Sequence, residues 1–267
     1  MAETAQLVDD SLAPSLRTAG LLDLPGIFSR EDMQVIKARL AERQTFRVNV
    51  GGDTYYVKRY HKPEPDSLLS GLFAQRFSSP ASREWHVLRK LAQLGVPAPR
   101  PAACLEEIRD GEVARAAIIT VGLPAEISLQ KVIQTQDLSA ARRHAMALEL
   151  GRLLRLMHEG GVNHRDFYLV HIRVGLDDTL YVTDLNRADI RRRVTRRWRV
   201  KDLAALEHSA PARVTRTDKA RLLRAYAGGR LRDHRDLIAA VLRKAARMDA
   251  HTRKRLSEGE TNFHVVE

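Results

Sequence analysis

The sequence has little cysteine, few aromatic residues and no long hydrophobic run, and each shortage excludes a class of protein. Cys104 is the only cysteine among 267 residues, which excludes an intramolecular disulfide framework and a cysteine-rich zinc site. No stretch of about 18 apolar residues occurs, so the sequence predicts no transmembrane helix. The N-terminal segment carries Glu3, Asp9 and Asp10 and has no basic stretch followed by an apolar one, which argues against a secretory signal. We therefore expect a cytoplasmic protein.

What the sequence does contain is a globular composition with a large excess of positive charge. Hydrophobic residues make up 44% of the chain, enough for a real core, and the formal net charge is +12. Such a charge predicts an anionic partner, which could be nucleic acid, anionic lipid or a phosphorylated substrate. No recognised nucleic-acid-binding motif occurs, so we expect no nucleic acid.

The N-terminal half reads as a mixture of strands and helices. Residues 1–28 lack periodicity and predict an irregular arm, and the Ser-Arg-Glu-Asp sequence that follows resembles a capping box that opens a helix over 29–42. Residues 46–50 and 54–60 alternate around a Gly-Gly-Asp turn and predict a β-hairpin with Lys58 on its second strand.

The next predicted helix carries a carboxylate on its apolar side. Ser79 is the expected N-cap, and Leu88 and Leu91 follow Glu84 at helical spacing, so Glu84 lies on the apolar stripe. An unpaired carboxylate there would be costly, and Lys58 is the candidate partner.

A buried strand at 117–121 and a short linker from Gly122 predict the boundary between two lobes. Beyond it the sequence becomes mostly helical. The strongest helical pattern covers 139–159 and stops at a Gly-Gly pair, and further helices are expected at 200–209, 218–227 (with Thr217 as N-cap) and 235–250.

Two aspartates in this second half suggest metal-assisted phosphoryl transfer. Asp166 ends a His-Arg-Asp sequence, and Asp184 follows an apolar run eighteen residues later. The segment between them predicts a second hairpin, which returns the chain to its starting point and brings Asp184 close to His171 and the preceding loop. One carboxylate can then orient a hydroxyl group while the other holds Mg²⁺.

These elements, taken in order, resemble a protein kinase, and they resemble more closely the lipopolysaccharide core kinases of the Kdo/WaaP family. The matching segments are Tyr56-Val57-Lys58-Arg59, Arg83-Glu84-Trp85, His164-Arg165-Asp166-Phe167-Tyr168, Asp184-Leu185-Asn186-Arg187-Ala188 and Lys201-Asp202-Leu203-Ala204. The resemblance implies an α+β, two-lobed protein-kinase-like fold. A small lobe over 29–121 would hold an antiparallel sheet, and a mostly helical catalytic lobe would cover 122–267.

The resemblance also implies residue roles toward ATP. Lys58 would hold the α- and β-phosphates, and Glu84 would orient Lys58 through an ion pair. Thr120, Val121 and Gly122 would form the hinge that receives adenine through backbone groups.

For the reaction itself, the resemblance assigns proton acceptance or alignment of the sugar hydroxyl to Asp166 and Mg²⁺ binding to Asp184. His171 stands where protein kinases place a metal-binding asparagine, so it is the candidate second metal ligand. No G-x-G-x-x-G sequence precedes Lys58, so the usual glycine-rich phosphate cover is absent. His164, Arg165 and Asp202 are expected to support the catalytic loop structurally.

The function implied is an ATP-dependent kinase for a Kdo or heptose sugar of the lipopolysaccharide inner core, acting at the cytoplasmic face of the inner membrane. The partners would be the core or lipid A acceptor and an anionic membrane surface, and the arginine-rich run over 191–199 would contact their phosphates. A protein or small-molecule kinase of the same fold, and a lipid-binding pseudokinase, are the alternatives.

Overall fold

A computed structural model describes residues 3–31, 33–39, 43–63, 74–124 and 127–259. The chain divides into two compact units. The sheet unit comprises Met1–Gln93, Ala98–Leu123 and Leu185–Arg187, and the helical unit comprises Leu94–Pro97, Pro124–Asp184 and Ala188–Glu267.

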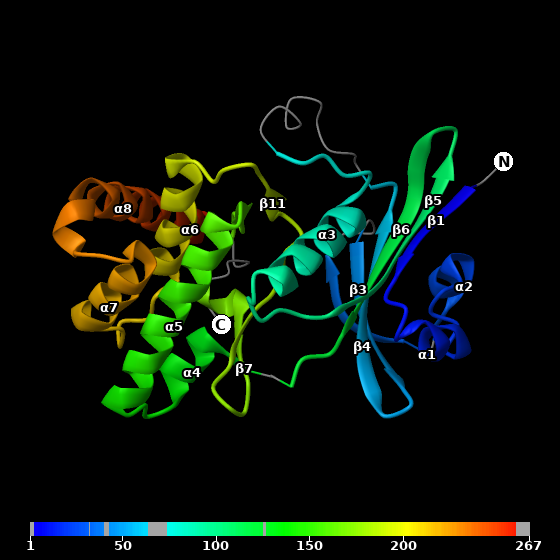
Figure 1. Ribbon diagram of the computed structural model, residues 1–267, viewed down its shortest axis with the longest axis horizontal. Coiled ribbons are helices and arrows are strands. Elements are labelled where there is room, and N and C mark those ends of the chain that lie inside the picture. Colours follow the sequence, from blue (N-terminus) through cyan, green and yellow to red (C-terminus); the bar gives the residue numbers. More distant parts are fainter. Residues whose placement is uncertain (1–2, 32, 40–42, 64–73, 125–126, 260–267) are drawn as a thin grey trace. The chain divides into compact units, whose positions relative to one another are not determined.

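The sheet unit is built on a six-stranded antiparallel sheet, drawn as arrows in Figure 1. In spatial order its strands are β1 (Glu3–Val8), β5 (Pro101–Arg109), β6 (Glu112–Val121), β4 (Asp53–His61), β3 (Arg43–Val50) and β2 (Gln34–Arg39). The predicted hairpin is β3 and β4, and the predicted buried strand is the second half of β6.

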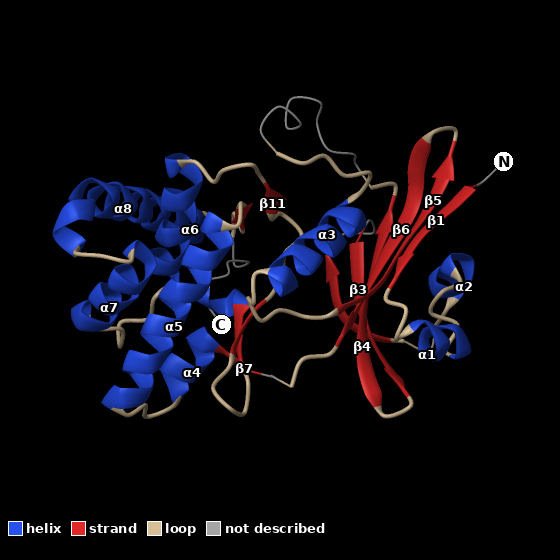
Figure 2. Ribbon diagram, viewed as in Figure 1, coloured by secondary structure: helices blue, strands red, loops and turns tan. Residues whose placement is uncertain are grey.

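Helices cover both faces of this sheet (Figure 2), and the alternation of side chains decides which residues face which helix. Val57 and its cross-strand partner Ile119 pack with the core that α1 (Ala13–Thr18) and α2 (Leu24–Ser29) complete. Lys58 therefore points to the opposite face, where α3 (Pro80–Gln93) packs on β5 and β6.

The N-terminal segment is structured, so the expected irregular arm over 1–28 is wrong. It forms β1, which pairs with β5, followed by α1 and α2. Leu16 and Leu21 are fully buried against the sheet. Helices of six residues present less than two turns of apolar pattern, which is too little for periodicity to reveal them.

The expected helix over 29–42 is also wrong where the structure describes the chain, and positions 32 and 40–42 of that prediction lie outside the described residues. Residues Gln34–Arg39 form strand β2 and pair with β3, with a register shift between Val35 and Lys37. A capping-box sequence only favours a helix, and pairing with the free edge of β3 outweighs that local preference.

The helical unit contains five α-helices within the described residues (Figure 1) and short strands that frame the loops between them. The helices are α4 (Leu129–Thr135), α5 (Ala140–Glu159), α6 (Arg196–Ser209), α7 (Arg216–Ala227) and α8 (Arg235–Ser257). The strands are β7 (Ile127–Ser128), β8 (Val162–Asn163), β9 (Ile172–Val174), β10 (Leu180–Val182) and β11 (Asp189–Ile190). Helix α5 packs extensively on α7, and α6 on α8.

Capping residues determine where the helices of this unit begin and end. Ser139 caps α5 by accepting the Arg142 N–H, and the helix stops at Gly160, at the Gly-Gly pair where the sequence predicts its end. The N-cap of α7 is Thr215 rather than the predicted Thr217, because Thr215 and Asp218 form a reciprocal capping box. Gly228 ends α7 in the left-handed conformation, at φ 66°.

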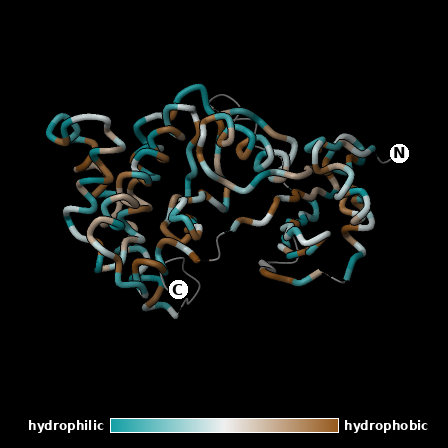
Figure 3. The backbone as a smooth tube through the Cα atoms, turned by 60° about the horizontal axis from the view of Figure 1, so that its bottom comes forward, coloured by the Kyte–Doolittle hydropathy of each residue, from teal (hydrophilic) through white to brown (hydrophobic). Residues whose placement is uncertain are grey.

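Hydrophobic and hydrophilic stretches alternate along the chain in Figure 3. Among the helices that the structure describes, none combines the length and the apolar character needed to span a bilayer.

Candidate active site

Lys58 and Glu84 form a close ion pair on the α3 side of the sheet. The Lys58 Nζ lies 2.6 Å from the Glu84 Oε1, and the two side chains are 16% and 4% exposed. The second carboxylate oxygen of Glu84, Oε2, is buried and accepts no hydrogen bond from the described residues. A charge this well buried needs its partner, so each side chain fixes the other. The pairing expected from the sequence is present, and its role toward ATP stays a prediction.

The predicted hinge lies at the end of β6 and is tied into the sheet unit by its backbone. The Val121 N–H donates to the Arg100 carbonyl at 2.9 Å, and the Gly122 N–H donates to the Thr54 carbonyl at 2.6 Å. A Cβ atom on Gly122 would lie 3.0 Å from that Thr54 oxygen, which explains why a glycine stands here. Thr120 is buried. Both N–H groups are thus already bonded, and the hinge assignment stays a prediction.

The side chain of Asp202 in α6 holds the loop that carries Asp166. The Asp202 carboxylate accepts the backbone N–H groups of His164 and Arg165, both at 2.8 Å, and the Asp202 side chain is completely buried. The His164 ring is buried as well, and its Nε2 lies 2.9 Å from the Thr183 carbonyl. These contacts confirm the structural roles expected for His164 and Asp202, and they position the Asp166 backbone.

Asp184 lies beside His171, as the hairpin predicts. Strands β9 and β10 pair antiparallel, and Thr183 donates to the His171 carbonyl from both its N–H and its hydroxyl group, each at 2.9 Å. The His171 Nδ1 is 3.6 Å from the Asp184 Oδ2. Because the His164 ring contacts Thr183, the residue before Asp184, the Asp166 loop and Asp184 belong to one packed cluster of the helical unit.

The donor set around Asp184 suits Mg²⁺ bound together with a nucleotide. Mg²⁺ prefers oxygen ligands, and it is usually held by one or two carboxylates together with substrate phosphates and water. The Asp184 carboxylate is 29% exposed, whereas the imidazole of His171 is a donor that suits softer metals. In the described residues no group of three or more His, Cys, Asp or Glu side chains could hold a metal by itself. The assignment of Asp184 and His171 to a metal stays a prediction.

Sequence reasoning missed a cluster of cations around Trp198 in α6. The side chains of Arg165, Arg191, Arg197 and Lys201 lie 4.8–5.5 Å from the Trp198 ring centre, and we call these five residues the Trp198 cluster. Lys201 also approaches the Asp166 carboxylate at 3.8 Å. The arginine-rich sequence was the only signal, since helical spacing in α6 gives no hint that Arg165 and Arg191 join it.

Asn186 is another residue whose importance the sequence did not reveal. The Tyr60 hydroxyl donates to the Asn186 Oδ1 at 2.9 Å, and an Arg83 guanidinium N–H donates to the Asn186 carbonyl at 3.1 Å. These bonds attach Leu185–Arg187 to the sheet unit, directly after Asp184.

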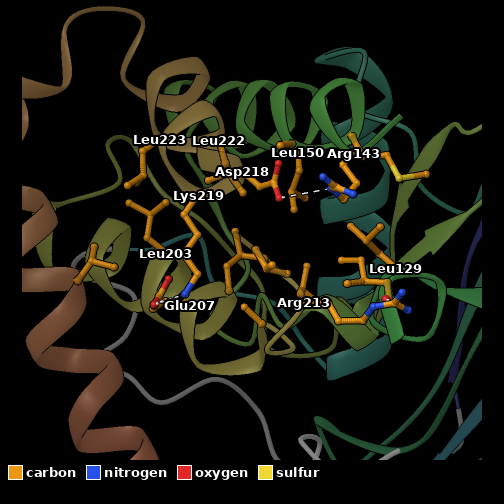
Figure 4. Close-up of a pocket in the computed structure, with 18 of the residues that line it drawn as sticks. Leu129, Arg143, Leu150, Leu203, Glu207, Arg213, Asp218, Lys219, Leu222 and Leu223 are labelled. Carbon is orange, nitrogen blue, oxygen red and sulfur yellow. Dashed lines mark hydrogen bonds and ion pairs between the residues drawn. The ribbon is translucent and has the colours of Figure 1, made fainter. Parts of the chain in front are cut away.

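The helical unit also contains an apolar cavity of about 110 Å³, shown in Figure 4. Aliphatic side chains from α4 to α8 form most of its wall, including Leu150, Leu203 and Leu222. Two ion pairs border it, one between Arg143 and Asp218 at 3.6 Å and one between Lys219 and Glu207 at 2.7 Å. An apolar interior with charged edges suits the hydrocarbon part of an amphipathic ligand.

The two units together carry the parts of a protein-kinase-like phosphotransferase. A strand lysine is paired with a helix carboxylate, a His-Arg-Asp loop is braced by a buried aspartate, and a second aspartate follows a hairpin. The chain matches the lipopolysaccharide kinase (Kdo/WaaP) family over residues 30–226 and belongs to that family.

Similar proteins agree with this membership. The lipopolysaccharide core heptose(I) kinase WaaP of Pseudomonas aeruginosa PAO1 is 33% identical over 225 residues, which cover 78% of this chain and 84% of that protein. The 3-deoxy-D-manno-octulosonic acid kinase of Xanthomonas campestris pv. campestris B100 is 33% identical over 127 residues, or 47% of this chain and 48% of that protein. A solved structure of WaaP in complex with acyl carrier protein matches 91% of this chain and 98% of its own, at 29% identity and a TM-score of 0.74. The expected α+β fold, with an antiparallel sheet and a helical region, is thereby confirmed.

Proposed function

We propose that this protein is an ATP-dependent kinase that phosphorylates a hydroxyl group of an inner-core sugar of lipopolysaccharide. Membership of the lipopolysaccharide kinase family supports this class of substrate. The main structural support for the activity is the buried Lys58–Glu84 ion pair. Removing two charged side chains from water costs free energy, and we expect a chain that no longer bound nucleotide to lose such a pair. A heptose is the favoured acceptor over Kdo, since the resemblance to a heptose kinase covers 78% of the chain and that to a Kdo kinase only 47%.

Residue roles follow from what phosphoryl transfer requires, which is positioning and charge stabilisation with little covalent chemistry by the protein. Lys58, oriented by Glu84, would bind the α- and β-phosphates of ATP. Asp166 would align the sugar hydroxyl and accept its proton, and Asp184 would hold Mg²⁺, with His171 fixing the Asp184 carboxylate or joining it as a ligand. When bound, Mg²⁺ would neutralise charge on the phosphates. Backbone groups of residues 120–122 would receive the adenine.

The activity is tested with purified protein, Mg²⁺-ATP and core lipopolysaccharide from cells that lack the corresponding kinase. We expect phosphate transfer to the glycolipid by the wild type and none by Asp166→Ala, provided that circular dichroism shows the variant to be folded. Labelling of a protein in place of the glycolipid would favour the protein-kinase alternative. Absence of transfer, together with no rise in melting temperature on adding nucleotide, would favour the pseudokinase.

We further propose that the protein binds an acyl carrier protein. The similar WaaP structure contains acyl carrier protein, and the cavity of the helical unit is lined by aliphatic side chains that suit an acyl chain. Leu242 of α8 lines this cavity and is 52% exposed, so Leu242→Gln should weaken binding of the acylated carrier without unfolding the protein. Leu256→Gln, on the same helix and 44% exposed, lies outside the cavity and is the matched control. Equal binding by the two variants would contradict the proposal.

Location at the inner membrane is part of the same proposal. The net charge of +12 favours contact with an anionic lipid surface, at about 1 kcal/mol for each basic side chain near it. We expect the protein to sediment with vesicles that contain anionic lipid and to be released by salt. Sedimentation that is unchanged at high salt would contradict an electrostatic attachment.

A further inference from the structure

Backbone contacts of β11 and Arg191 hold the Trp198 cluster in place. Strand β11 pairs with β8, which runs directly into the His-Arg-Asp loop, and the Arg191 N–H donates to the Gly161 carbonyl at 2.8 Å. Gly161 has φ 84°, and a Cβ atom there would lie 2.2 Å from the Arg191 carbonyl oxygen, so only glycine permits this approach. The basic segment is thus fixed alongside the catalytic loop.

Within the cluster, the arginines have distinct surroundings. The Arg191 side chain is 10% exposed and bonds to Asn163 at 2.8 Å and to Asp189 at 2.6 Å. Arg165 reaches the same Asp189 carboxylate at 3.6 Å. Arg197, in contrast, is exposed and forms no ion pair with any residue of the described chain. Arg191 is a fixed structural member, and Arg197 can move to meet a ligand.

The cluster brings several positive charges together. Four cations lie around one indole ring, and Arg197 among them pairs with no carboxylate of the described residues. The ring attracts cations through its face, but the cations repel one another, and an anion bound among them would remove that repulsion. Guanidinium groups bind carboxylate and phosphate groups with two parallel hydrogen bonds.

We propose that the Trp198 cluster is a binding subsite for an anionic group of the acceptor, a carboxylate or a phosphate, next to the hydroxyl group that Asp166 aligns. Lys201 links the two sites, because its Nζ lies 3.8 Å from the Asp166 carboxylate and 5.5 Å from the Trp198 ring centre. The subsite rests on the proposed function, and it specifies which acceptors this protein selects: sugars with a negative charge close to the phosphorylated hydroxyl.

The kinetic test compares two arginines of the same basic run. Arg197→Gln should raise the KM for the glycolipid acceptor about tenfold, the loss of one charge-assisted hydrogen bond, and leave the KM for ATP within about twofold. Arg193→Gln is the matched control, because Arg193 is also exposed but lies outside the Trp198 cluster. If the two variants raise the acceptor KM equally, the run is only a general basic surface and the subsite is refuted.

The source of the anion is identified with modified acceptors. Methyl esterification of the acceptor carboxylates, or enzymatic removal of its phosphates, should abolish the difference in KM between the wild type and Arg197→Gln for whichever group occupies the subsite. A difference that survives both treatments overturns the proposal.

A binding measurement keeps the subsite separate from the proposed function. In a Trp85→Phe background Trp198 is the only remaining tryptophan, so its fluorescence reports on the cluster directly. Inorganic phosphate or acetate should change this fluorescence saturably, and Arg197→Gln should weaken that response. No saturable change with either anion refutes the subsite, whereas a normal response in a protein that transfers no phosphate to glycolipid refutes only the proposed function.

Discussion

The His158 imidazole lies against the Asp202 carboxylate, with Nε2 3.2 Å from Oδ2, and neither side chain is more than 1% exposed. His158 comes from α5 and Asp202 from α6, and the other ring nitrogen of His158 lies 2.8 Å from the Tyr226 hydroxyl of α7. Since the same carboxylate accepts two N–H groups of the Asp166 loop, three helices fix the position of that loop through one side chain. Burial, the largest influence, raises the pKa of Tyr226 to about 12, so its hydroxyl remains protonated and able to donate to His158.

Replacement of Asp202 should therefore damage both stability and catalysis. Asp202→Ala leaves two backbone N–H groups without their acceptor and should lower the free energy of unfolding by about 3 kcal/mol. A loop displaced by about 1 Å should lower kcat by about 100-fold. Urea unfolding and acceptor phosphorylation measure the two effects. Asp137→Ala, at a fully exposed side chain, should change neither.

The contact between α5 and α7 depends on a glycine. A Cβ atom on Gly151 would lie 2.3 Å from the Leu222 carbonyl oxygen and 2.9 Å from the Ala225 Cβ, so Gly151→Ala must push the helices apart. We expect a loss of about 1–3 kcal/mol and a melting temperature lower by several degrees. Gly229→Ala, where nothing lies within 4 Å of the added carbon, should melt like the wild type. A Gly151→Ala protein of unchanged melting temperature would show that the contact is looser than this.

Stability should fall in acid partly because of Asp218. Burial acts to raise the pKa of this carboxyl group, but the hydrogen bonds from Thr215 and the charges of Arg143 and Arg221 hold the pKa below its ordinary value of 3.8. A group whose pKa is lower in the folded state stabilises the fold above its unfolded pKa, and that contribution is lost as the pH falls through the folded pKa. Melting temperatures of the wild type and Asp218→Asn should therefore differ most at neutral pH and converge below about pH 3.8. Curves that stay parallel down to pH 2 would remove Asp218 from the explanation.

The Lys58–Glu84 pair should behave as one unit in a double-mutant cycle. Lys58→Met leaves the Glu84 carboxylate buried without its partner and should destabilise the sheet unit by about 3–5 kcal/mol. Adding Glu84→Gln to Lys58→Met should restore part of that loss, although neither protein should respond to Mg²⁺-ATP by a rise in melting temperature. Effects that simply add would mean that the pair is not energetically coupled.

The ion pair and the hairpins could be predicted because their signals are local and regular. Glu84 stands on an apolar stripe of fourteen helical residues, and Lys58 follows a strand pattern, so each position is fixed by its own element. The hairpin that carries Asp184 was found in the same way. Strand β2 and the N-terminal elements escaped prediction, because their conformations depend on pairing with distant strands and on packing against the sheet.

The arginine-rich run shows why the rest of the site was hidden. Sequence suggested a single basic surface over 191–199, whereas the structure places Arg191 in a buried network with Asp189 and turns Arg197 toward Trp198. Arg165 joins them from a different part of the chain. The density of arginines in the sequence does not show which side chain is buried in an ion pair and which is exposed. Arg191 is buried because β11 pairs with β8.

The single cysteine makes the protein a ready background for site-specific labelling. Cys104 lies inside the sheet unit, where burial and the charges of Glu106 and Glu84 raise the pKa of its thiol well above the ordinary value, so it will react slowly with maleimides. A cysteine introduced at Leu176, a fully exposed hairpin position of the helical unit, would then be the only fast-reacting thiol. Paired with a second exposed cysteine in the sheet unit, it would let spectroscopic probes follow the distance between the two units as nucleotide and acceptor bind.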